Sequence, residues 1–220
     1  MDYLHNLLKE LDSFHSPTVI YASSGSVYGN EEMDFTERID GLIPTNAYAF
    51  TKWSLDSNMH RRPGAYGLRF FNVYGPREQA KGDMASLVHK GLAKEAPLYR
   101  DGQWKLFKSH RPDVRHGEQA RDFVHVDDVC NVIWHFATTD QARGIYNVGS
   151  GTARTFNDLV TAVDPTLPIE YVDMPEVLRP QYQYHTKADL TKLRAAGYTE
   201  PFMTLEQGVE KTREWLKVNS

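Results

Sequence analysis

The chain has 220 residues, 40% of them hydrophobic and 25% charged, which predicts an ordinary folded globule. Its net charge of -4 excludes a general attraction to nucleic acid or anionic lipid, and its apolar runs are too short to span a membrane. The first residues lack the features of a signal peptide and Cys130 is the only cysteine, so we expect a cytoplasmic protein without an internal disulfide.

Predicted helices and strands alternate along the chain. Helical spacing of apolar residues predicts helices over 2–14, 46–60, 84–94, 128–138, 155–163, 187–196 and 204–218. Short runs rich in strand-forming residues predict strands over 18–22, 66–73, 123–126, 145–148 and 169–172. The polar stretch 99–120 predicts a long loop. This alternation predicts an α/β fold with a largely parallel sheet.

Tyr48 and Lys52 are four residues apart in a predicted helix, so their side chains share one face. A cation beside a phenol stabilises the phenolate, which is the form that can accept a proton. Ser24 follows a predicted strand, and the carboxyl ends of strands are where open α/β sheets place their sites. This set of residues can support hydride exchange between a sugar carbon and a nicotinamide ring.

Each of these signals is weak when taken alone. With 12 tyrosines in the chain, a Tyr-x-x-x-Lys match arises by chance about as often as not, and it can be a simple surface pair. Ser24 alone reads as a turn cap, and Asn72 alone reads as a turn residue. Their order, and their placement at a strand end, on a helix and at a second strand end, argue against coincidence.

Six further motifs run nearly the length of the chain. They are YGPRE (74–78), KGDMAS (81–86), LFKSHRP (106–112), RDFVHV (121–126), RPQYQ (179–183) and ADLTKLRAAGY (188–198). In these motifs, together with Ser24, Tyr48 and Lys52, the chain resembles the extended short-chain dehydrogenases/reductases of the nucleotide-sugar epimerase group. The resemblance implies the C-terminal part of a Rossmann-type parallel sheet, over 1–80 and 122–150, with a small α/β substrate-binding lobe, mainly over 81–121 and 151–220.

The resemblance also implies roles for single residues. Tyr48 matches one catalytic acid/base, and Lys52 matches its helper and a ligand of the cofactor ribose. Ser24 matches the group that polarises the reacting oxygen. Lys81 matches a second acid/base, although alone it would read as a solvated loop lysine. Val73 matches a backbone contact to the cofactor, which Tyr48 and Lys81 also contact.

Substrate-binding positions are carried over in the same way. Asn72, Arg121 and Tyr182 match positions that hold the nucleotide sugar, and the planar fork of an arginine suits a diphosphate. The simpler interpretations are a surface pair between Arg121 and Asp122, and core packing for Tyr182. The remaining matches are Phe107, Lys108 and Ser109. No metal site is expected.

The motifs resemble those of the members that invert C6″ of ADP-heptose through a 6-keto intermediate, with NADP or NAD, for the inner core of lipopolysaccharide. The resemblance implies a homo-oligomer. Two alternatives stay open. One is another nucleotide-sugar epimerase or a dehydratase, although Gly25-Ser26 after Ser24 argues against a dehydratase. The other is a truncated chain without independent activity, a remnant or a partner module.

The chain also departs from the family. Asp83 stands where a small or polar residue is common, and Lys90, beside His89, stands where some members have a substrate-contacting histidine. Family members begin with a strand and a Gly-rich turn that binds pyrophosphate, whereas this sequence starts with a predicted helix. We therefore expect this chain alone to bind cofactor poorly and to turn over slowly, or to need a separate N-terminal cofactor-binding polypeptide.

Overall fold

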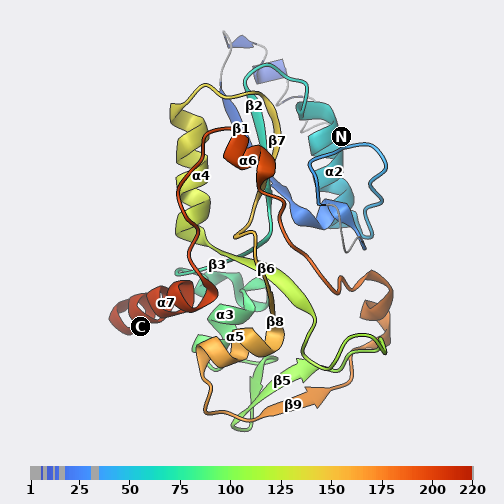
Figure 1. Ribbon diagram of the computed structural model, residues 1–220, viewed down its shortest axis with the longest axis vertical. Helices are drawn as coiled ribbons and strands as arrows, with labels where there is room; N and C mark the ends of the chain where they lie inside the picture. Colours follow the sequence, from blue (N-terminus) through green and yellow to red (C-terminus); the bar gives the residue numbers. More distant parts are fainter. Residues whose placement is uncertain (1–5, 7–8, 12, 15–17, 31–34, 220) are drawn as a thin grey trace.

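The computed structural model describes residues 6, 9–11, 13–14, 18–30 and 35–219. The helix expected over 2–14 falls mainly outside these residues. The described part is a mixed α/β structure, and Figure 1 shows its elements in two groups. One group surrounds strands β1, β2 and β7, and the other surrounds β5 and β9, with β6 extending between the two groups.

The first sheet is parallel, with strand order β1-β2-β7. It consists of β1 (Val19–Ser24), β2 (Ala65–Phe70) and β7 (Gly144–Val148). Every residue of β7 is buried, as expected for a parallel strand covered on both faces. Ser24 pairs with Phe70, and Phe70 pairs with Val148, so all three strands end at one edge of the sheet. The parallel sheet predicted from the sequence is confirmed.

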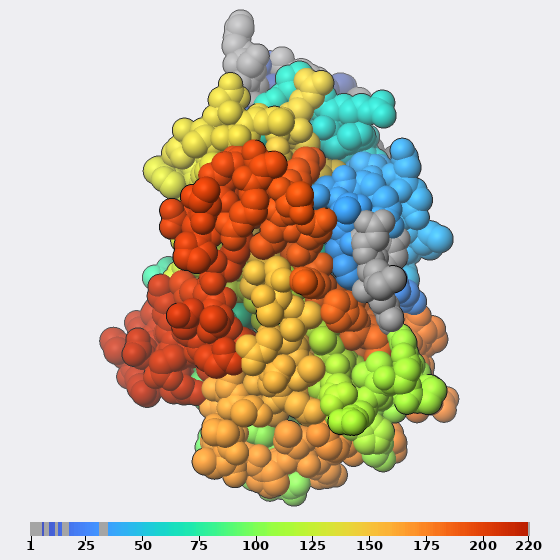
Figure 2. All heavy atoms as spheres, in the orientation of Figure 1, coloured from blue at the N-terminus to red at the C-terminus, as the bar shows by residue number. Residues whose placement is uncertain are grey.

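Helices cover both faces of the first sheet. Helix α2 (Ala47–Met59) lies on one side, and α4 (Val126–Thr138) lies on the other (Figure 1). The short α6 (Thr191–Ala195) adds to the α4 side, where Leu193 packs with Leu68 and Phe136 in one apolar core. Figure 2 shows the C-terminal segment, in red, passing over the front of this group and down to the second.

The strand predicted over 66–73 is two strands, because the chain leaves the first sheet after Phe70. The Phe71 amide donates to Val148, and β3 (Asn72–Tyr74) then pairs in parallel with β6 (Ala120–His125). The third strand of this second sheet is β8 (Ala153–Thr155), which is antiparallel to β6. The switch places Asn72 where the two sheets meet.

The loop predicted over 99–120 is wrong in its first half. That half forms β4 (Tyr99–Arg100) and β5 (Gln103–Phe107), and β5 pairs with β9 (Ile169–Val172). Asp101 and Gly102 both have positive φ, at 53° and 77°, which is the conformation of a two-residue hairpin turn. The Asp-Gly pair is the sequence signal for this turn, but the many charged residues around it favoured the prediction of a loop.

Three helices pack against the second sheet and against the third sheet, which consists of β4, β5 and β9. They are α3 (Leu87–Leu92), α5 (Phe156–Val163) and α7 (Leu205–Asn219), and their apolar side chains form a second core with Trp104. Three 3-10 helices complete the described elements: η1 (Gly25–Tyr28), η2 (Gln79–Met84) and η3 (Glu176–Gln181). No helix in the described part of the chain is both long and apolar enough to cross a membrane.

The helix predicted over 187–196 is shorter than expected, because its first residues are held elsewhere. The Ala188 amide donates to the Asp122 carboxylate at 2.9 Å, and the same carboxylate accepts from the Ser150 and Gly151 amides. Asp122 is fully buried, so this contact fixes residues near 188 against the end of β7. The helix then begins only at Thr191.

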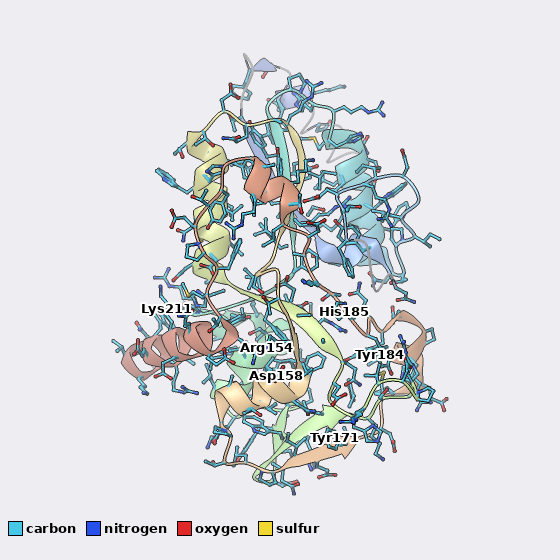
Figure 3. The ribbon with its side chains drawn as sticks, in the orientation of Figure 1. Arg154, Asp158, Tyr171, Tyr184, His185 and Lys211 are labelled. Carbon is cyan, nitrogen blue, oxygen red and sulfur yellow. The ribbon has the colours of Figure 1, made fainter. Side chains whose placement is uncertain are left out.

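A partly exposed charge cluster joins α5 to α7. Arg154 donates to Glu206 at 2.6 Å and to Asp158 at 3.2 Å, and Figure 3 shows Arg154 and Asp158 side by side. The hydrogen bond from Arg154 lowers the pKa of Glu206 to about 2. Glu206 therefore stabilises the fold above its ordinary pKa near 4.5, and this contribution is lost as the pH falls toward 2.

We expect Glu206→Gln to lower the free energy of unfolding at pH 7 by less than about 1 kcal/mol, because the pair is half exposed. Urea unfolding at pH 7 and at several values below pH 4.5 measures this, with the exposed Glu176→Gln as a control. The difference in the free energy of unfolding between the wild type and Glu206→Gln should become smaller as the pH falls. A difference that stays constant with pH would show that the Arg154 bond does not stabilise the charged form.

Candidate active site

Tyr48 and Lys52 lie at the start of α2, one turn apart. The Asn46 side chain accepts a hydrogen bond from the Ala49 amide at 2.9 Å and so caps the helix at this point. The Lys52 ammonium lies 5.8 Å from the centre of the Tyr48 ring. It also donates to the Ala22 carbonyl at 2.9 Å, which ties α2 to the carboxyl end of β1. The phenol and the ammonium are therefore neighbours, as the spacing predicts.

Ser24 is the last residue of β1 and the cap of η1. Its hydroxyl accepts from the Ser26 amide at 3.1 Å, so the turn-cap interpretation is correct. A hydroxyl that accepts one bond keeps its own hydrogen for donation, so capping does not exclude a role toward a bound molecule. The neighbouring Ser23 is 2% exposed, and its hydroxyl has no hydrogen-bond partner within the described part of the structure.

The segment that follows β3 carries Lys81. This segment forms one wall of a pocket, and Tyr48, Lys52 and Ser24 lie on another wall. Lys81 belongs to η2, and its ammonium lies 3.2 Å from the carboxylate of Glu78. The Lys81 side chain is 53% exposed, whereas that of Glu78 is 4% exposed. The Glu78 carboxylate also accepts hydrogen bonds from the Gly75 and Ser86 amides and from the Ser86 hydroxyl.

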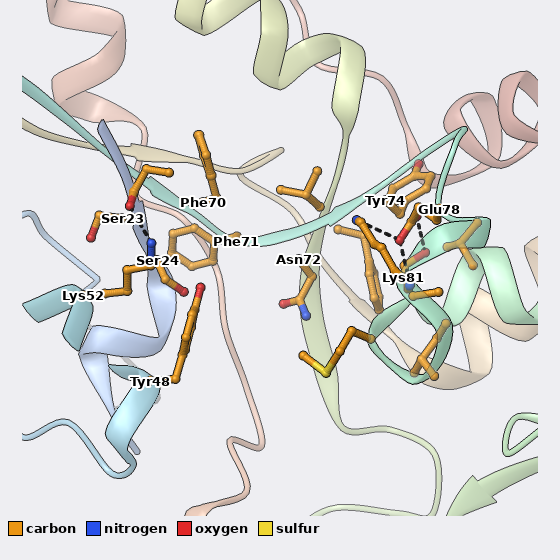
Figure 4. A pocket seen from close by; sticks show the side chains of 18 of the residues that line it. Ser23, Ser24, Tyr48, Lys52, Phe70, Phe71, Asn72, Tyr74, Glu78 and Lys81 are labelled. Atoms are coloured by element: carbon orange, nitrogen blue, oxygen red, sulfur yellow. Dashed lines mark hydrogen bonds and ion pairs between the residues drawn. The ribbon is translucent and has the colours of Figure 1, made fainter. Parts of the chain in front are cut away.

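One pocket of about 480 Å³ brings these walls together. The predicted residues that line it are Ser24, Tyr48, Lys52, Asn72, Val73 and Lys81. Figure 4 shows Tyr48, Lys52 and Ser24 on one side, Lys81 with Glu78 on the opposite side, and Asn72 between them. Tyr48 is 58% exposed, so its ring opens to the pocket instead of filling the core.

Arg121, Phe107 and Tyr182 line a second pocket of about 240 Å³. Leu87 and Phe156 line both pockets, so the two cavities are adjacent. The Arg121 side chain is largely enclosed by aromatic rings, with its guanidinium carbon 5.1 Å from the centre of Tyr182 and 5.6 Å from that of Phe156.

The surface pair between Arg121 and Asp122 does not form. Arg121 is 8% exposed and donates to the Ala120 carbonyl, while Asp122 accepts from backbone amides and Ser150. Among the residues that the structure describes, no carboxylate pairs with Arg121. Burial lowers the pKa of this guanidinium below its usual range. A buried cation without a counter-ion is costly, and a bound anion would offset that cost.

Lys108 and Ser109 line neither of these two pockets. Lys108 pairs with Asp173 at 3.0 Å, and the Ser109 hydroxyl donates to the Arg111 carbonyl at 2.9 Å. They follow Phe107 directly, on the segment that leaves β5. Of the six predicted substrate residues, the structure therefore places Asn72 in the first pocket and Arg121, Phe107 and Tyr182 in the second.

The residues that depart from the family pattern are buried or take part in hydrogen bonds with the backbone. His89 and Lys90 are 2% and 6% exposed, and the Lys90 ammonium donates to the Asp83 carbonyl at 2.7 Å. Ser23 and Glu78 also line the first pocket, although neither is a site residue predicted from the sequence. The signal was available, since Glu78 ends the YGPRE motif, three residues before Lys81. No group of three or more His, Cys, Asp or Glu side chains that could hold a metal occurs among the described residues.

Known proteins with similar sequences agree with this geometry. The NAD dependent epimerase/dehydratase family matches residues 2–149. An ADP-L-glycero-D-manno-heptose-6-epimerase of Nitratidesulfovibrio vulgaris (strain DP4) is 42% identical over 208 residues, which are 90% of this chain and 64% of the relative. The chain therefore spans about 64% of the length of that curated relative.

Two solved structures show the same fold. The Helicobacter pylori ADP-L-glycero-D-manno-heptose-6-epimerase is 31% identical, with a TM-score of 0.77 over 97% of this chain and 63% of that one. A Bacillus cereus UDP-glucuronic acid 4-epimerase, solved with UDP-glucuronic acid and NAD, is 21% identical with a TM-score of 0.74, over 97% of this chain and 66% of that one. The resemblance predicted from the motifs is confirmed, and the chain belongs to the NAD dependent epimerase/dehydratase family.

Proposed function

We propose that this chain carries the reaction site of an epimerase that inverts C6″ of ADP-glycero-manno-heptose through a 6-keto intermediate. The observation that carries the proposal is the 480 Å³ pocket, which has Tyr48 and Lys52 on one side and Lys81 on the other. The 42% identity to a relative named for this activity supports the choice of substrate.

Inversion through a ketone requires proton transfer at one oxygen in two different orientations. Tyr48 accepts the proton of the C6″ hydroxyl as that carbon becomes a ketone, and Lys52 stabilises the phenolate. Ser24 donates a hydrogen bond to the same oxygen. The ketone then turns to present its other face, and Lys81 donates a proton to the oxygen from the opposite side of the pocket. Tyr48 then loses a proton to solvent and Lys81 regains one from solvent, which both exposed side chains can reach.

A bound nicotinamide cofactor would accept the hydride from C6″ and return it to the other face. The residues present fit such a group. The Lys52 ammonium has three hydrogens, and among the described residues its one acceptor is the Ala22 carbonyl, so two hydrogens remain for ribose hydroxyls. The buried Ser23 hydroxyl lines the pocket without a partner and can bond to a polar group of the cofactor.

The second pocket suits the nucleotide half of the substrate. Arg121 supplies a buried positive charge for the diphosphate, and the rings of Phe107 and Tyr182 supply apolar surface for the base. Because the two pockets are adjacent, a nucleotide in the second can place its sugar in the first. Asn72, between the pocket walls in Figure 4, is positioned to bond with that sugar.

From the family resemblance we further propose that the cofactor is NADP and not NAD. We also propose that the protein acts in building the lipopolysaccharide inner core, as a homo-oligomer in the cytoplasm. The division into a Rossmann-type part and a substrate-binding lobe is proposed from the same resemblance. We propose that Lys108 and Ser109 contact the substrate from the rim that follows Phe107.

The function is tested by incubating the purified chain with ADP-D-glycero-D-manno-heptose and NADP, and by separating the two C6″ epimers. Millimolar NADP is used so that the cofactor is in excess. We expect the L-glycero epimer to appear until the two forms reach equilibrium. Inversion of UDP-glucuronic acid in its place would assign the site to another nucleotide sugar.

We expect Arg121→Gln to weaken the binding of ADP by about 10- to 100-fold, because a hydrogen bond to a charged group contributes about 1.5–3 kcal/mol. Isothermal titration of ADP into the wild type and the variant measures this directly. Arg115→Gln is the matched control, because the Arg115 side chain is 88% exposed. Equal ADP affinity in the Arg121 variant and the wild type would remove Arg121 from the binding site.

A further inference from the structure

Glu78 is a buried acid whose bonds converge from three parts of the pocket wall. Its carboxylate accepts from the Gly75 amide at 3.0 Å, where β3 ends. It accepts from the Ser86 amide and hydroxyl, each at 2.8 Å, where α3 begins. It also accepts from the Lys81 ammonium at 3.2 Å. One side chain therefore ties together the two ends of the 75–86 segment and the amine that this segment carries.

The electrostatics of Glu78 favour a permanent negative charge. Burial alone would raise the pKa of this carboxyl, but the hydrogen bonds from Ser86, Gly75 and Lys81 together hold the pKa below its usual value. Glu78 is 3% exposed, so water does not compete for these bonds. The Lys81 ammonium is thus the one exposed member of the set, and its partner is fixed.

The backbone around Lys81 would not hold that amine in place by itself. Gly82 has a φ of 52°, which interrupts η2 directly after Lys81. The Lys90 ammonium bonds to the Asp83 carbonyl and so holds the backbone of the segment. An exposed lysine has many rotamers, and holding it in one orientation costs conformational entropy. The bond from Glu78 selects the rotamers that bring the ammonium to the pocket.

We propose that Glu78 is the positioning residue for Lys81, holding its ammonium on the side of the pocket that faces Tyr48. This inference rests on the proposed function for the role of Lys81, but the contact itself does not. Among the described residues Glu78 accepts one of the three ammonium hydrogens, so two remain for the reacting oxygen.

The contact can be tested without catalysis, by acylating the purified chain with a water-soluble succinimidyl ester and measuring modification of each lysine by peptide mass spectrometry. The exposed Lys187 serves as the internal reference. In Glu78→Gln we expect Lys81 to react about fivefold faster relative to Lys187, because a partly exposed ion pair is lost. Glu210→Gln is the matched control, since it removes another carboxylate from an i,i+3 pair, with Arg213.

Glu78→Asp keeps the negative charge on a shorter side chain, so we expect Lys81 to be acylated at an intermediate rate. This variant replaces Glu78→Gln in the experiment if Glu78→Gln does not fold. Unchanged labelling of Lys81 in whichever variant folds would overturn the proposal. A uniform rise in the labelling of all lysines would also overturn it, because it would show a loosened fold. These outcomes stand whether or not the chain inverts ADP-heptose.

If the chain does invert ADP-heptose, the rate gives a second readout. We expect Glu78→Gln to lower kcat by about tenfold with little change in KM, because orienting an acid/base acts on the chemical step. A change confined to KM would assign Glu78 to substrate binding and overturn positioning. A failure of the wild type to turn over would count against the proposed function and would leave the labelling result to decide on Glu78.

Discussion

Replacing Tyr48 by phenylalanine should lower the rate of C6″ inversion by about 10²- to 10⁴-fold, the range that a positioned acid/base supplies. Only the hydroxyl is removed, and Tyr48 is 58% exposed at the pocket, so the fold should be kept. The rate of epimer formation at saturating NADP measures the effect. The binding of ADP should stay within about twofold of the wild type, because the hydroxyl is not in the second pocket.

Tyr99→Phe is the matched control for this experiment. Tyr99 lies in β4, and it lines neither of the two pockets that form the proposed site. The same hydroxyl is removed there, and the rate should not change. If Tyr48→Phe kept the wild-type rate, Tyr48 would not be the acid/base, and the pair of Tyr48 and Lys52 would be only a surface pair on α2.

Replacing Asp56 by alanine should destabilise the fold by about 3–5 kcal/mol, because it leaves the buried Arg69 guanidinium without its counter-ion. Both side chains are 0% exposed, and they pair at 2.8 Å between α2 and β2. Asp56 follows Tyr48 and Lys52 at four-residue intervals, so the same face of α2 carries all three. The pair therefore also fixes the rotation of α2 that presents Tyr48 to the pocket.

Urea unfolding of the wild type and Asp56→Ala measures this loss. Glu170→Ala is the control, since it breaks a pair with Lys105 in which the glutamate is 48% exposed, and it should cost less than about 1 kcal/mol. Adding Arg69→Met to Asp56→Ala should recover part of the stability, because the unpaired charge is then gone. Equal costs for Asp56→Ala and Glu170→Ala would show that the pair does not stabilise the fold.

The Tyr48 side of the pocket could be predicted from the sequence because its geometry is local. The four-residue spacing of Tyr48 and Lys52 and the strand-end position of Ser24 follow from helix and strand periods. The parallel sheet followed from the buried apolar strands. Val73 and Lys81 were found by motif, and the structure brings both into the same pocket.

The missed features depend on contacts between distant segments. The break after Phe70 comes from a bond between Phe71 and Val148, which no local pattern reveals. Glu78 resembles any surface glutamate until Ser86 and Gly75 enclose it. The late start of α6 depends on Asp122, which lies 66 residues from Ala188 along the chain. Such tertiary contacts override local propensity.

The most direct test of the proposed reaction uses ADP-D-glycero-D-manno-heptose that carries deuterium at C6″, incubated with the chain and NADP in ordinary water. Hydride that leaves C6″ and returns to the same carbon keeps the label. We therefore predict the L-glycero epimer with deuterium at C6″, detected by NMR and mass spectrometry. Inverted product in which solvent hydrogen has replaced the deuterium would contradict the reaction, and so would an absence of inversion at saturating NADP.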